Sequence, residues 1–230
     1  MILFVETSGK LGGLLLADPT LQKIFQTQWT DQVSHSETIT HEFEKIISQA
    51  SIEPKDLQKI ILDVGPGSFT GLRVAFGFAL SLSYLLQIPI LEFNSLELAS
   101  LQSSAEQILV SFPAIKGNHY VAAYERKNGE LIEIVSPQSA TDDELQNFST
   151  QFRSHVSTSL NAHWPKVEDM LTFYRQKPRV FQEKSWNLVH PLYLRRSQAE
   201  ENLSRGLLKP LYDESESEVE HSNKEEGGGS

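Results

Sequence analysis

Short apolar runs and polar turns alternate over the first thirty residues and then give way to a helical pattern. The runs are four to six residues long and are separated by glycine, aspartate or proline, which is typical of β-strands. They cover Ile2–Val5, Leu14–Ala17 and Ile24–Trp29. Behind Ser34 the apolar residues recur every three or four positions, which predicts an amphipathic helix that ends near Ala50. Ser34 and Glu37 have the spacing of a capping box at its start.

The next elements alternate between strand and helix. Lys59–Val64 is a short apolar run that predicts a strand, and a glycine-rich turn separates it from a helix over Phe69–Leu86. This helix is apolar nearly all round, so we expect it to be buried on most of its sides. A strand at Ile90–Phe93 follows, and then a helix that Ser95 caps and that reaches about Leu101.

The second half of the chain repeats this order of elements, with little similarity of the residues themselves. Its predicted strands are 108–112, 120–124, 131–135 and 155–159, and its predicted helices run from 141 to about 148 and over 166–176. A duplicated unit of three strands, a helix, a strand and a helix is the architecture of the actin-like ATPase (ASKHA) fold in the α/β class. We therefore predict two related β-β-β-α-β-α lobes.

Negative charge is concentrated at the C-terminal end. The net charge is −10, and residues 213–230 contain seven acidic side chains against one lysine. Because almost no apolar residue follows Leu211, we predict an acidic disordered tail at 213–230, whose final Gly-Gly-Gly-Ser resembles a linker. The body of the chain is divided into an N-terminal lobe at 1–103, a C-terminal lobe at 104–190 and a segment at 191–212 that returns to the N-terminal lobe.

The composition excludes several classes of protein. The chain has no cysteine, which excludes disulfides, thiolate metal sites and cysteine nucleophiles. It has no dense basic run of the kind that a protein binding nucleic acid by itself carries. No apolar run is long enough to span a membrane, and no signal peptide precedes the first strand, so we expect a cytoplasmic protein. His35 and His41 are six positions apart, which does not make a metal pair on a helix, and we predict no metal site.

Residues 65–73, Gly-Pro-Gly-Ser-Phe-Thr-Gly-Leu-Arg, join a predicted strand to the apolar helix. The glycines on either side of the proline permit positive φ and the proline fixes its own φ, so the turn is sharp and rigid. Ser68 or Thr70 can cap the helix, and free N–H groups at its start would suit a phosphate, with Arg73 close by. A tight structural turn explains the same residues. No Gly-Lys-Ser/Thr follows, so this is not a Walker P-loop.

Small residues form a stripe along the helix behind this turn. Gly71, Ala75, Ala79 and Ser83 are four positions apart and lie on one face. Such a stripe lets another helix approach closely, either the predicted helix before Ala50 or a helix of another subunit. The residues alone favour packing within the chain, because most apolar helix faces fill their own core.

The turn after the first strand carries the other candidate site. In actin-like folds an acid and small polar residues approach a nucleotide phosphate here, and Glu6-Thr7-Ser8-Gly9 has these residue types. Glu6 could take that part, although an ordinary polar turn at the end of a strand fits equally well. No Ser/His/Asp arrangement has a recognisable motif context, and Ser68 is not in a Gly-x-Ser-x-Gly elbow.

Residues 63–73 resemble the signature of the bacterial TsaB family, also called YeaZ, of tRNA threonylcarbamoyladenosine biosynthesis proteins. Further similarities follow in chain order: the first strand and its turn at 2–8, His-Ser-Glu at 35–37, and Pro-Leu-Tyr-Leu-Arg at 191–195. Two departures weaken the case for nucleotide binding by this chain. Glu6 stands where the family has Asp, and residues 113–120 keep the family's Ala, Gly and Tyr but lack its Asp and Arg.

The resemblance implies a non-catalytic subunit with no catalytic residue of its own. The family's TsaD-type partner would transfer threonylcarbamoyl onto the adenosine beside the tRNA anticodon, and a TsaE-type ATPase would join the assembly. The chain would form a heterodimer with the TsaD-type subunit, or a homodimer when alone, and would meet tRNA through the complex. No cofactor is assigned to the chain itself, and ATP or ADP at the partner interface is the one nucleotide considered.

The resemblance also assigns site residues, because the family's helices beside the glycine motif form the subunit contact. The predicted partner interface comprises His35, Ile39, Phe43, Gly71, Ala75, Ala79 and Leu82. The candidate nucleotide or phosphate contacts are Glu6, Gly65, Gly67, Ser68, Thr70 and Arg73. Two other functions remain open: an autonomous ATP-binding phosphotransferase or glycoprotease-like hydrolase, and a structural homodimer that acts in another process.

Overall fold

The computed structural model describes residues 1–30, 34–114, 117–157, 164–176 and 179–194. These residues lie within one unit, Met1–Leu194. The predicted acidic tail, most of the returning segment at 191–212 and the last two residues of the predicted strand at 155–159 lie outside the described ranges.

A five-stranded mixed sheet forms the first lobe, in the order β3-β2-β1-β4-β5. Its strands are β1 (Ile2–Glu6), β2 (Leu11–Ala17), β3 (Ile24–Thr30), β4 (Lys59–Asp63) and β5 (Ile90–Phe93). The hairpins put β1, β2 and β3 antiparallel, whereas β4 lies parallel to β1 and β5 parallel to β4. This arrangement brings the polar residues at the ends of β1 and β4 to the same edge of the sheet.

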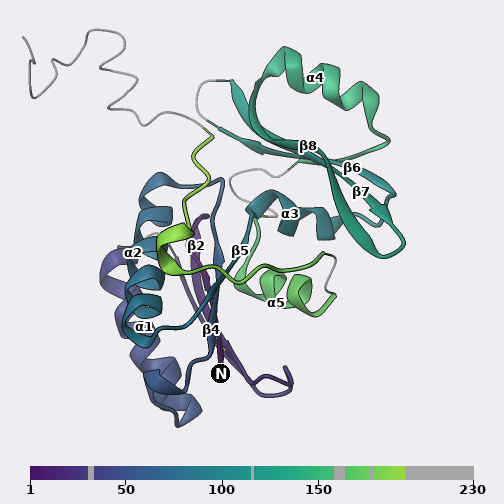
Figure 1. The fold of residues 1–230 in the computed structure, drawn as a ribbon. Coiled ribbons are helices and arrows are strands. Elements are labelled where there is room, and N and C mark those ends of the chain that lie inside the picture. The colour runs from purple at the N-terminus through teal and green to yellow at the C-terminus, as the bar shows by residue number, and fades with distance from the viewer. Residues whose placement is uncertain (31–33, 115–116, 158–163, 177–178, 195–230) are drawn as a thin grey trace, which may run out of the picture. The chain divides into compact units, whose positions relative to one another are not determined.

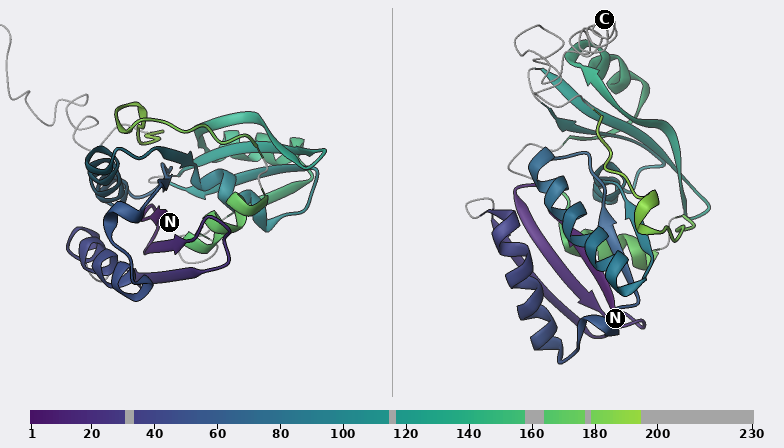
Figure 2. Two further views of the ribbon diagram at one scale, coloured as in Figure 1. Left: turned by 60° about the horizontal axis from the view of Figure 1, so that its bottom comes forward. Right: turned by 60° about the vertical axis from the view of Figure 1, so that its left-hand side comes forward.

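Helices cover both faces of this sheet (Figure 1). Helices α1 (His35–Ala50) and α2 (Phe69–Leu86) lie on one face, and the views in Figure 2 show them side by side. The other face packs against α5 (Val167–Gln176) and α3 (Ser95–Ala99), which continues into a 3₁₀ turn at Ser100–Gln102. A second 3₁₀ turn, Pro54–Asp56, precedes β4.

The second sheet has four strands in the order β8-β7-β6-β9. They are β6 (Gln107–Pro113), β7 (Asn118–Lys127), β8 (Glu130–Thr141) and β9 (Ser154–Ser157), and helix α4 (Asp142–Gln151) connects β8 to β9. This pairing repeats that of β3-β2-β1-β4, with a parallel strand added beyond two antiparallel pairs. The predicted duplication of β-β-β-α-β-α units is therefore confirmed.

The alternation of β1 divides the hydrophobic core into two layers. Leu3 and Val5 point toward α1 and α2, whereas Ile2 and Phe4 point toward α5 and the inner face of the second sheet. Successive side chains of a strand point to opposite faces, so a strand that is apolar throughout must be covered on both sides. All five residues of β1 are buried.

Two predicted helix caps differ in the structure. Ser34 is the N-cap residue of α1 as predicted, but its side chain makes no capping hydrogen bond, and its hydroxyl lies 2.7 Å from Ser36 Oγ. At α3 the cap is Asn94 and not Ser95: Asn94 Oδ1 accepts from the Glu97 N–H at 2.8 Å, and Glu97 accepts from the Asn94 N–H at 3.3 Å. The Ser95 hydroxyl is used elsewhere, in the buried cluster described below.

The chain returns to the first sheet earlier than the predicted position 191. Helix α5 already packs against β1 and β2, and residues 179–194, called the strap here, follow the edge of this sheet. Lys184 exchanges two backbone hydrogen bonds of 2.9 Å with Ile90, and the Leu192 N–H donates to Val64 O at 2.8 Å. The strap includes the 3₁₀ turn Trp186–Leu188, and Trp186 contacts the Tyr84 ring of α2 at 5.3 Å. Helix α5, which falls within the predicted C-terminal lobe, thus packs on the core of the first sheet, and the boundary at 190 stays a prediction.

Candidate functional site

The glycine turn packs directly on the turn that follows β1. Gly65 has φ +98° as predicted, and its N–H donates to Asp63 Oδ1 at 2.9 Å. Gly67 does not have positive φ. Glycine is required at this position because a Cβ there would lie 2.4 Å from Ser8 O. The Ser68 N–H donates to that same carbonyl oxygen at 2.7 Å.

These contacts occupy two of the N–H groups that could have received a phosphate. The Ser68 N–H is bound to Ser8 O, and Ser68 Oγ caps α2 by accepting from the Gly71 N–H at 3.2 Å. Thr7 Oγ1 donates to Gly71 O at 2.7 Å, which ties the β1 turn to the first turn of the helix. The cap at Ser68 is confirmed, and the turn holds α2 against the end of β1.

Two carboxyl groups are buried together beneath this turn. Glu6, at the end of β1, is 1% exposed, and Asp63, at the end of β4, is 0% exposed. Ser8 Oγ lies 2.5 Å from Glu6 Oε1 and 3.0 Å from Asp63 Oδ2. Ser95 Oγ donates to Asp63 Oδ2 at 2.7 Å and lies 3.1 Å from Ser8 Oγ. These four side chains are called the buried acid cluster below.

Burial raises the pKa of both carboxyls because the charged form loses its hydration. Desolvation is the largest effect on Glu6, and the charge of Asp63 raises its pKa further. Desolvation also raises the pKa of Asp63, to about 7, against hydrogen bonds from Gly65, Ser95 and Ser8 that lower it. At neutral pH the cluster is therefore expected to be partly protonated, whereas exposed carboxyls are ionised.

Trp164 covers the buried acid cluster from the outside. Its indole Nε1–H donates to Ser8 Oγ at 3.0 Å, and its ring lies against Phe112 of β6 with centroids 4.4 Å apart. Gly9 is needed below the ring, since a Cβ there would lie 2.4 Å from Trp164 Cδ1. The Trp164 ring thus occupies the space beside Ser8 and Gly9.

The raised pKa values predict an unusual dependence of stability on pH. A carboxyl whose folded pKa lies above its unfolded value stabilises the fold fully below the unfolded pKa, and this contribution is lost as the pH rises through the folded value. Compared with Glu6→Gln, the wild-type free energy of unfolding is expected to fall more steeply as the pH rises from 4 to 8. Urea unfolding of both proteins across this range tests the expectation. Parallel curves for the two proteins would contradict it.

The small-residue stripe of α2 faces inward, so its predicted role at a partner interface is wrong. Ala75 and Ala79 are fully buried, and Gly71 and Ser83 are buried too. A Cβ at Gly71 would lie 1.9 Å from Thr7 O, so the helix touches the β1 turn of its own chain. The three predicted interface residues Gly71, Ala75 and Ala79 cannot be reached by a second subunit. Close approach does occur at the stripe, where Gly71 lies against Thr7 in the turn after β1.

The outer face of α2 remains exposed, contrary to the expectation that the helix is buried on most sides. Tyr84 is 56% exposed and Leu85 is 72% exposed. By length and composition alone α2 is the one described helix that could span a membrane, yet its inner face packs on the first sheet. An apolar helix with one open face on a globular lobe is typical of a protein interface.

A groove of about 810 Å³ runs between the outer faces of α1 and α2. Its walls include Ile39, Phe43 and Leu82 of the predicted interface, and the Phe43 and Phe78 rings meet in its floor at 5.1 Å. The rest of its lining comprises Ser36, Thr40, Glu44, Pro54, Thr70, Arg73, Val74, Gly77, Ser81 and Leu85. His35 lies beside the start of α1, where its Nδ1 accepts from Trp29 Nε1–H at 2.8 Å.

The outer face of α2 carries small residues of its own. Thr70, Gly77 and Ser81 are exposed and line the groove, and a Cβ at Gly77 would meet nothing within 4 Å. This second line of small residues, and not the predicted stripe, is the one that an approaching helix could reach. The sequence contained the signal, but the inner stripe has the more regular spacing.

The structure separates the candidate nucleotide contacts into two groups. Glu6 and Gly65 are buried beneath the turn, whereas Ser68, Thr70 and Arg73 are exposed at the start of α2. The Arg73 guanidinium lies 4.1 Å from the centre of the Phe69 ring, which in turn lies 4.9 Å from the Tyr193 ring of the strap. The predicted residues therefore do not converge on one phosphate. The sequence assigned Ser95 only as a helix cap and did not single out Trp164, and both come from distant segments.

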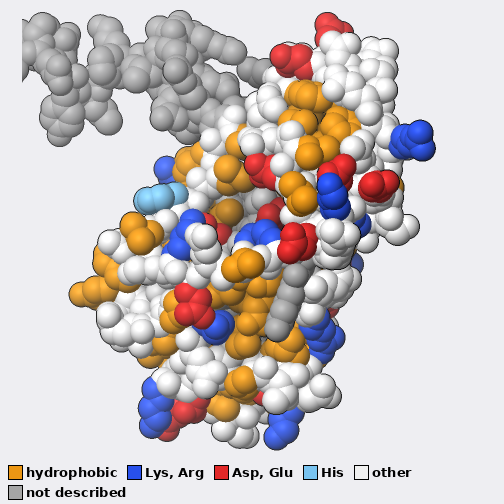
Figure 3. All heavy atoms as spheres, turned by 45° about the vertical axis from the view of Figure 1, so that its right-hand side comes forward, with side chains coloured by type: hydrophobic (Ala, Val, Ile, Leu, Met, Phe, Trp, Pro, Cys, Tyr) orange, Lys and Arg blue, Asp and Glu red, His pale blue; other side chains and the backbone are white. Residues whose placement is uncertain are grey.

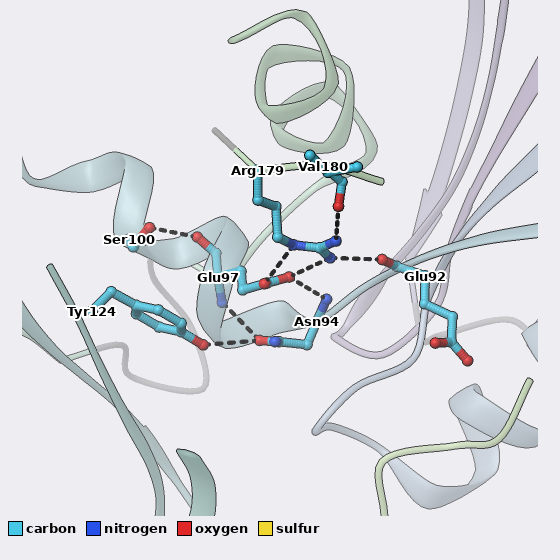
Figure 4. A network of polar contacts seen from close by, with 7 residues as sticks. All are labelled: Glu92, Asn94, Glu97, Ser100, Tyr124, Arg179 and Val180. Carbon is cyan, nitrogen blue, oxygen red and sulfur yellow. Dashed lines mark hydrogen bonds and ion pairs between the residues drawn. The ribbon is translucent and has the colours of Figure 1, made fainter. Parts of the chain in front are cut away.

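A polar network fastens the strap to β5 and α3 (Figure 4). Arg179 Nε and Nη2 donate to the two oxygens of Glu97 at 2.9 and 3.1 Å, and Nη2 also donates to Glu92 O at 2.9 Å. The carboxylate of Glu92 pairs with Lys184. These residues line a cavity of about 440 Å³, and Figure 3 shows basic and acidic side chains adjoining one another between larger apolar areas on one face. The charges in this network are paired, which is typical of a structural clamp.

Comparison with known proteins gives a consistent result at the level of sequence. Residues 30–168 match the model of the TsaD family, described as tRNA N6-adenosine threonylcarbamoyltransferase. The chain is 30% identical over 221 residues to the tRNA threonylcarbamoyladenosine biosynthesis protein TsaB of Bacillus subtilis, covering 86% of this chain and 96% of that protein. It is 29% identical over 154 residues to the TsaB protein of Buchnera aphidicola subsp. Schizaphis graminum, covering 62% and 71%.

Comparison of structures agrees with this. A crystal structure from Pseudomonas aeruginosa, of an uncharacterized protein with similarity to peptidase YEAZ, superposes with a TM-score of 0.68. The two chains are 18% identical, and the match covers 84% of this chain and 99% of the other. The fold is therefore the actin-like fold predicted from the order of elements.

Proposed function

Because the chain belongs to the TsaB (YeaZ) family of tRNA threonylcarbamoyladenosine biosynthesis proteins, we propose that it is a non-catalytic partner subunit in this tRNA modification. It supports a TsaD-type subunit, which transfers threonylcarbamoyl onto the adenosine beside the anticodon. The observation that carries the proposal is the apolar groove between α1 and α2, beside the glycine motif.

The state of the buried acid cluster supports a non-catalytic role. A general base or a group that binds a nucleotide must be within hydrogen-bond reach of its substrate. Glu6 and Asp63 are buried, and Trp164 lies between Ser8 and the outside. The acidic groups at the end of β1 and β4 are used to hold the fold together. This arrangement gives no support to an autonomous phosphotransferase or hydrolase.

The groove is suited to a pair of helices from a related subunit. It is mostly apolar, it is open along α2, and the exposed small residues Thr70, Gly77 and Ser81 allow a close approach of another backbone. The sequence match to the TsaD family implies that a TsaD-type subunit has the same fold, and so offers a similar helix pair. We propose a heterodimer across the groove, and a homodimer through the same face when the chain is alone.

The other members of the assembly follow from this assignment. A TsaE-type ATPase joins the heterodimer, and tRNA is held by the complex, since this chain has no dense basic run. A nucleotide, ATP or ADP, would lie at the partner interface, near the exposed Ser68, Thr70 and Arg73. We place the protein in the cytoplasm, where tRNA is modified.

Reconstitution tests the proposal. The purified chain alone is expected to form no threonylcarbamoyladenosine, whereas addition of cognate TsaD-type and TsaE-type subunits, tRNA and the threonylcarbamoyl donor gives modified adenosine, measured by mass spectrometry of digested tRNA. Omitting only this chain is expected to reduce the product at least tenfold. Full activity without it would contradict the subunit role, and steady ATP hydrolysis by the chain alone would favour an autonomous enzyme.

A further inference from the structure

The buried acid cluster has more oxygen contacts than its hydroxyl hydrogens can satisfy. Four contacts join its oxygens: Glu6 to Ser8 at 2.5 Å, Ser8 to Asp63 at 3.0 Å, Ser8 to Ser95 at 3.1 Å and Ser95 to Asp63 at 2.7 Å. Each serine hydroxyl donates one hydrogen. The two hydroxyl hydrogens therefore serve two of the four contacts.

The donors from outside do not make up the difference. Trp164 Nε1–H donates to Ser8 Oγ, so the serine oxygen already accepts one hydrogen. The Ser8 N–H donates to Glu6 Oε1 at 2.6 Å, and the Gly65 N–H donates to Asp63 Oδ1. Neither hydrogen lies between Ser8 Oγ and Asp63 Oδ2. When the Ser8 hydroxyl donates to Glu6, its contact with Asp63 Oδ2 therefore has no hydrogen. A proton on Asp63 supplies that hydrogen, so three hydrogens serve three of the four contacts, and the longest contact, between Ser8 and Ser95, is the one left without a hydrogen.

A bound metal ion does not fit the same oxygens. Two adjacent oxygen ligands of an octahedral Mg²⁺ lie about 2.9 Å apart, and those of larger ions lie further apart. The 2.5 Å contact between Glu6 Oε1 and Ser8 Oγ is shorter than this and has the length of a charge-assisted O–H···O bond. The group that joins these oxygens is therefore a hydrogen.

We propose that Glu6 and Asp63 share one proton at neutral pH and that this proton keeps Trp164 closed over the buried acid cluster. When the pH rises and the proton leaves, two negative charges face one serine hydroxyl in a buried site. Like charges in such a site repel strongly, so the cluster must open to admit water. Trp164 lies on its outer side and is attached through Ser8, so the indole is the group that moves.

The charged groups around the cluster also favour its protonated form. From α3 the carboxylate of Glu97 raises the pKa of Asp63, and Glu97 is itself paired with Arg179 of the strap. The hydrogen bonds to the two carboxyls come from uncharged groups of the β1 turn, the glycine turn and the start of α3. No cation among the described residues is paired with Glu6 or Asp63 by an ion pair.

Carboxyl and indole NMR signals of the intact chain test the proposal directly. In the wild type labelled with ¹³C at Asp and Glu carboxyls and ¹⁵N at Trp, one carboxyl is expected to titrate between about pH 6 and pH 8. The Trp164 indole N–H signal is expected to move with the same midpoint. Glu6→Gln should shift both transitions together, because it takes away one of the two carboxyls that share the proton, and Glu130→Gln, which removes an exposed carboxylate elsewhere, should leave them unchanged.

Two outcomes would overturn the proposal. If Glu6 and Asp63 both titrate below pH 5 in the wild type, they do not share a proton at neutral pH. If a carboxyl titrates near pH 7 while the Trp164 signal stays constant, the proton does not keep Trp164 closed. Both results come from the wild type, so they stand even where Glu6→Gln fails to fold. Neither depends on a partner subunit, so they are independent of the proposed function.

Discussion

Replacing Gly77 with tryptophan is expected to abolish capture of the TsaD-type subunit while the chain itself stays folded. A Cβ at Gly77 meets nothing within 4 Å, so the larger side chain projects from the outer face of α2 into the groove. There it takes the space that an approaching helix would need. We expect the dissociation constant to rise at least 100-fold, about 2.7 kcal/mol, because close packing at the centre of an interface carries most of the binding energy.

The same position offers a matched control. Gly77→Ala adds only a methyl group and should bind the partner within a few-fold of the wild type, and helix propensity should stabilise it by roughly 0.5–1 kcal/mol. Binding is measured by isothermal titration calorimetry, and folding by circular dichroism. Undiminished binding by Gly77→Trp would show that the partner does not use the groove, whatever the result of the reconstitution assay.

Gly71→Ala, on the same helix, is expected to have the opposite effect on stability. Its Cβ would lie 1.9 Å from Thr7 O and 3.1 Å from Thr7 C, and backbone atoms cannot move aside as the end of a long side chain can. Either α2 shifts away from the sheet or the hydrogen bond from Thr7 Oγ1 to Gly71 O breaks. We expect a loss of about 3 kcal/mol or more in the free energy of unfolding, as for other overpacked core positions.

Urea unfolding of Gly71→Ala and Gly77→Ala side by side provides the test. Both substitutions add one methyl group to one helix, and the gain in helix propensity is the same for each. Any difference between the two midpoints therefore reports the tertiary contact at Thr7. Equal midpoints would mean that α2 is not seated on the β1 turn as the structure has it.

The sequence alone predicted the order of elements, because that order depends on local periodicity. Strands such as Ile90–Phe93 and the bounds of the Phe69–Leu86 helix are confirmed as predicted. A cap was misassigned at Ser95, since both Asn94 and Ser95 have a side chain that can accept from a helix N–H. The choice between them depends on Asp63, a residue that is distant in sequence and takes up the Ser95 hydroxyl.

The glycine motif shows what sequence determines and what it leaves to the tertiary structure. Its residue types required a sharp turn at the start of α2, since glycine and proline restrict the backbone whatever surrounds them. They did not determine what the turn contacts. Gly67 is needed for Ser8 rather than for a positive φ, and the amide of Ser68 serves the same Ser8 carbonyl rather than a phosphate.

The two lines of small residues on α2 also separate what the sequence predicts from what the tertiary structure decides, here for the partner surface. Periodicity alone located the stripe at Gly71, Ala75, Ala79 and Ser83, because residues three or four apart share a face of any helix, and the second line was found only from its exposure in the structure. Which line is buried depends on how α2 is rotated against the sheet. This rotation is set by the contacts of Gly71 and Ser68 with Thr7 and Ser8, in the turn after β1. A contact between segments some sixty residues apart leaves no periodic pattern in the sequence. Only the tertiary structure therefore shows that Gly71 faces inward and that Gly77 faces outward.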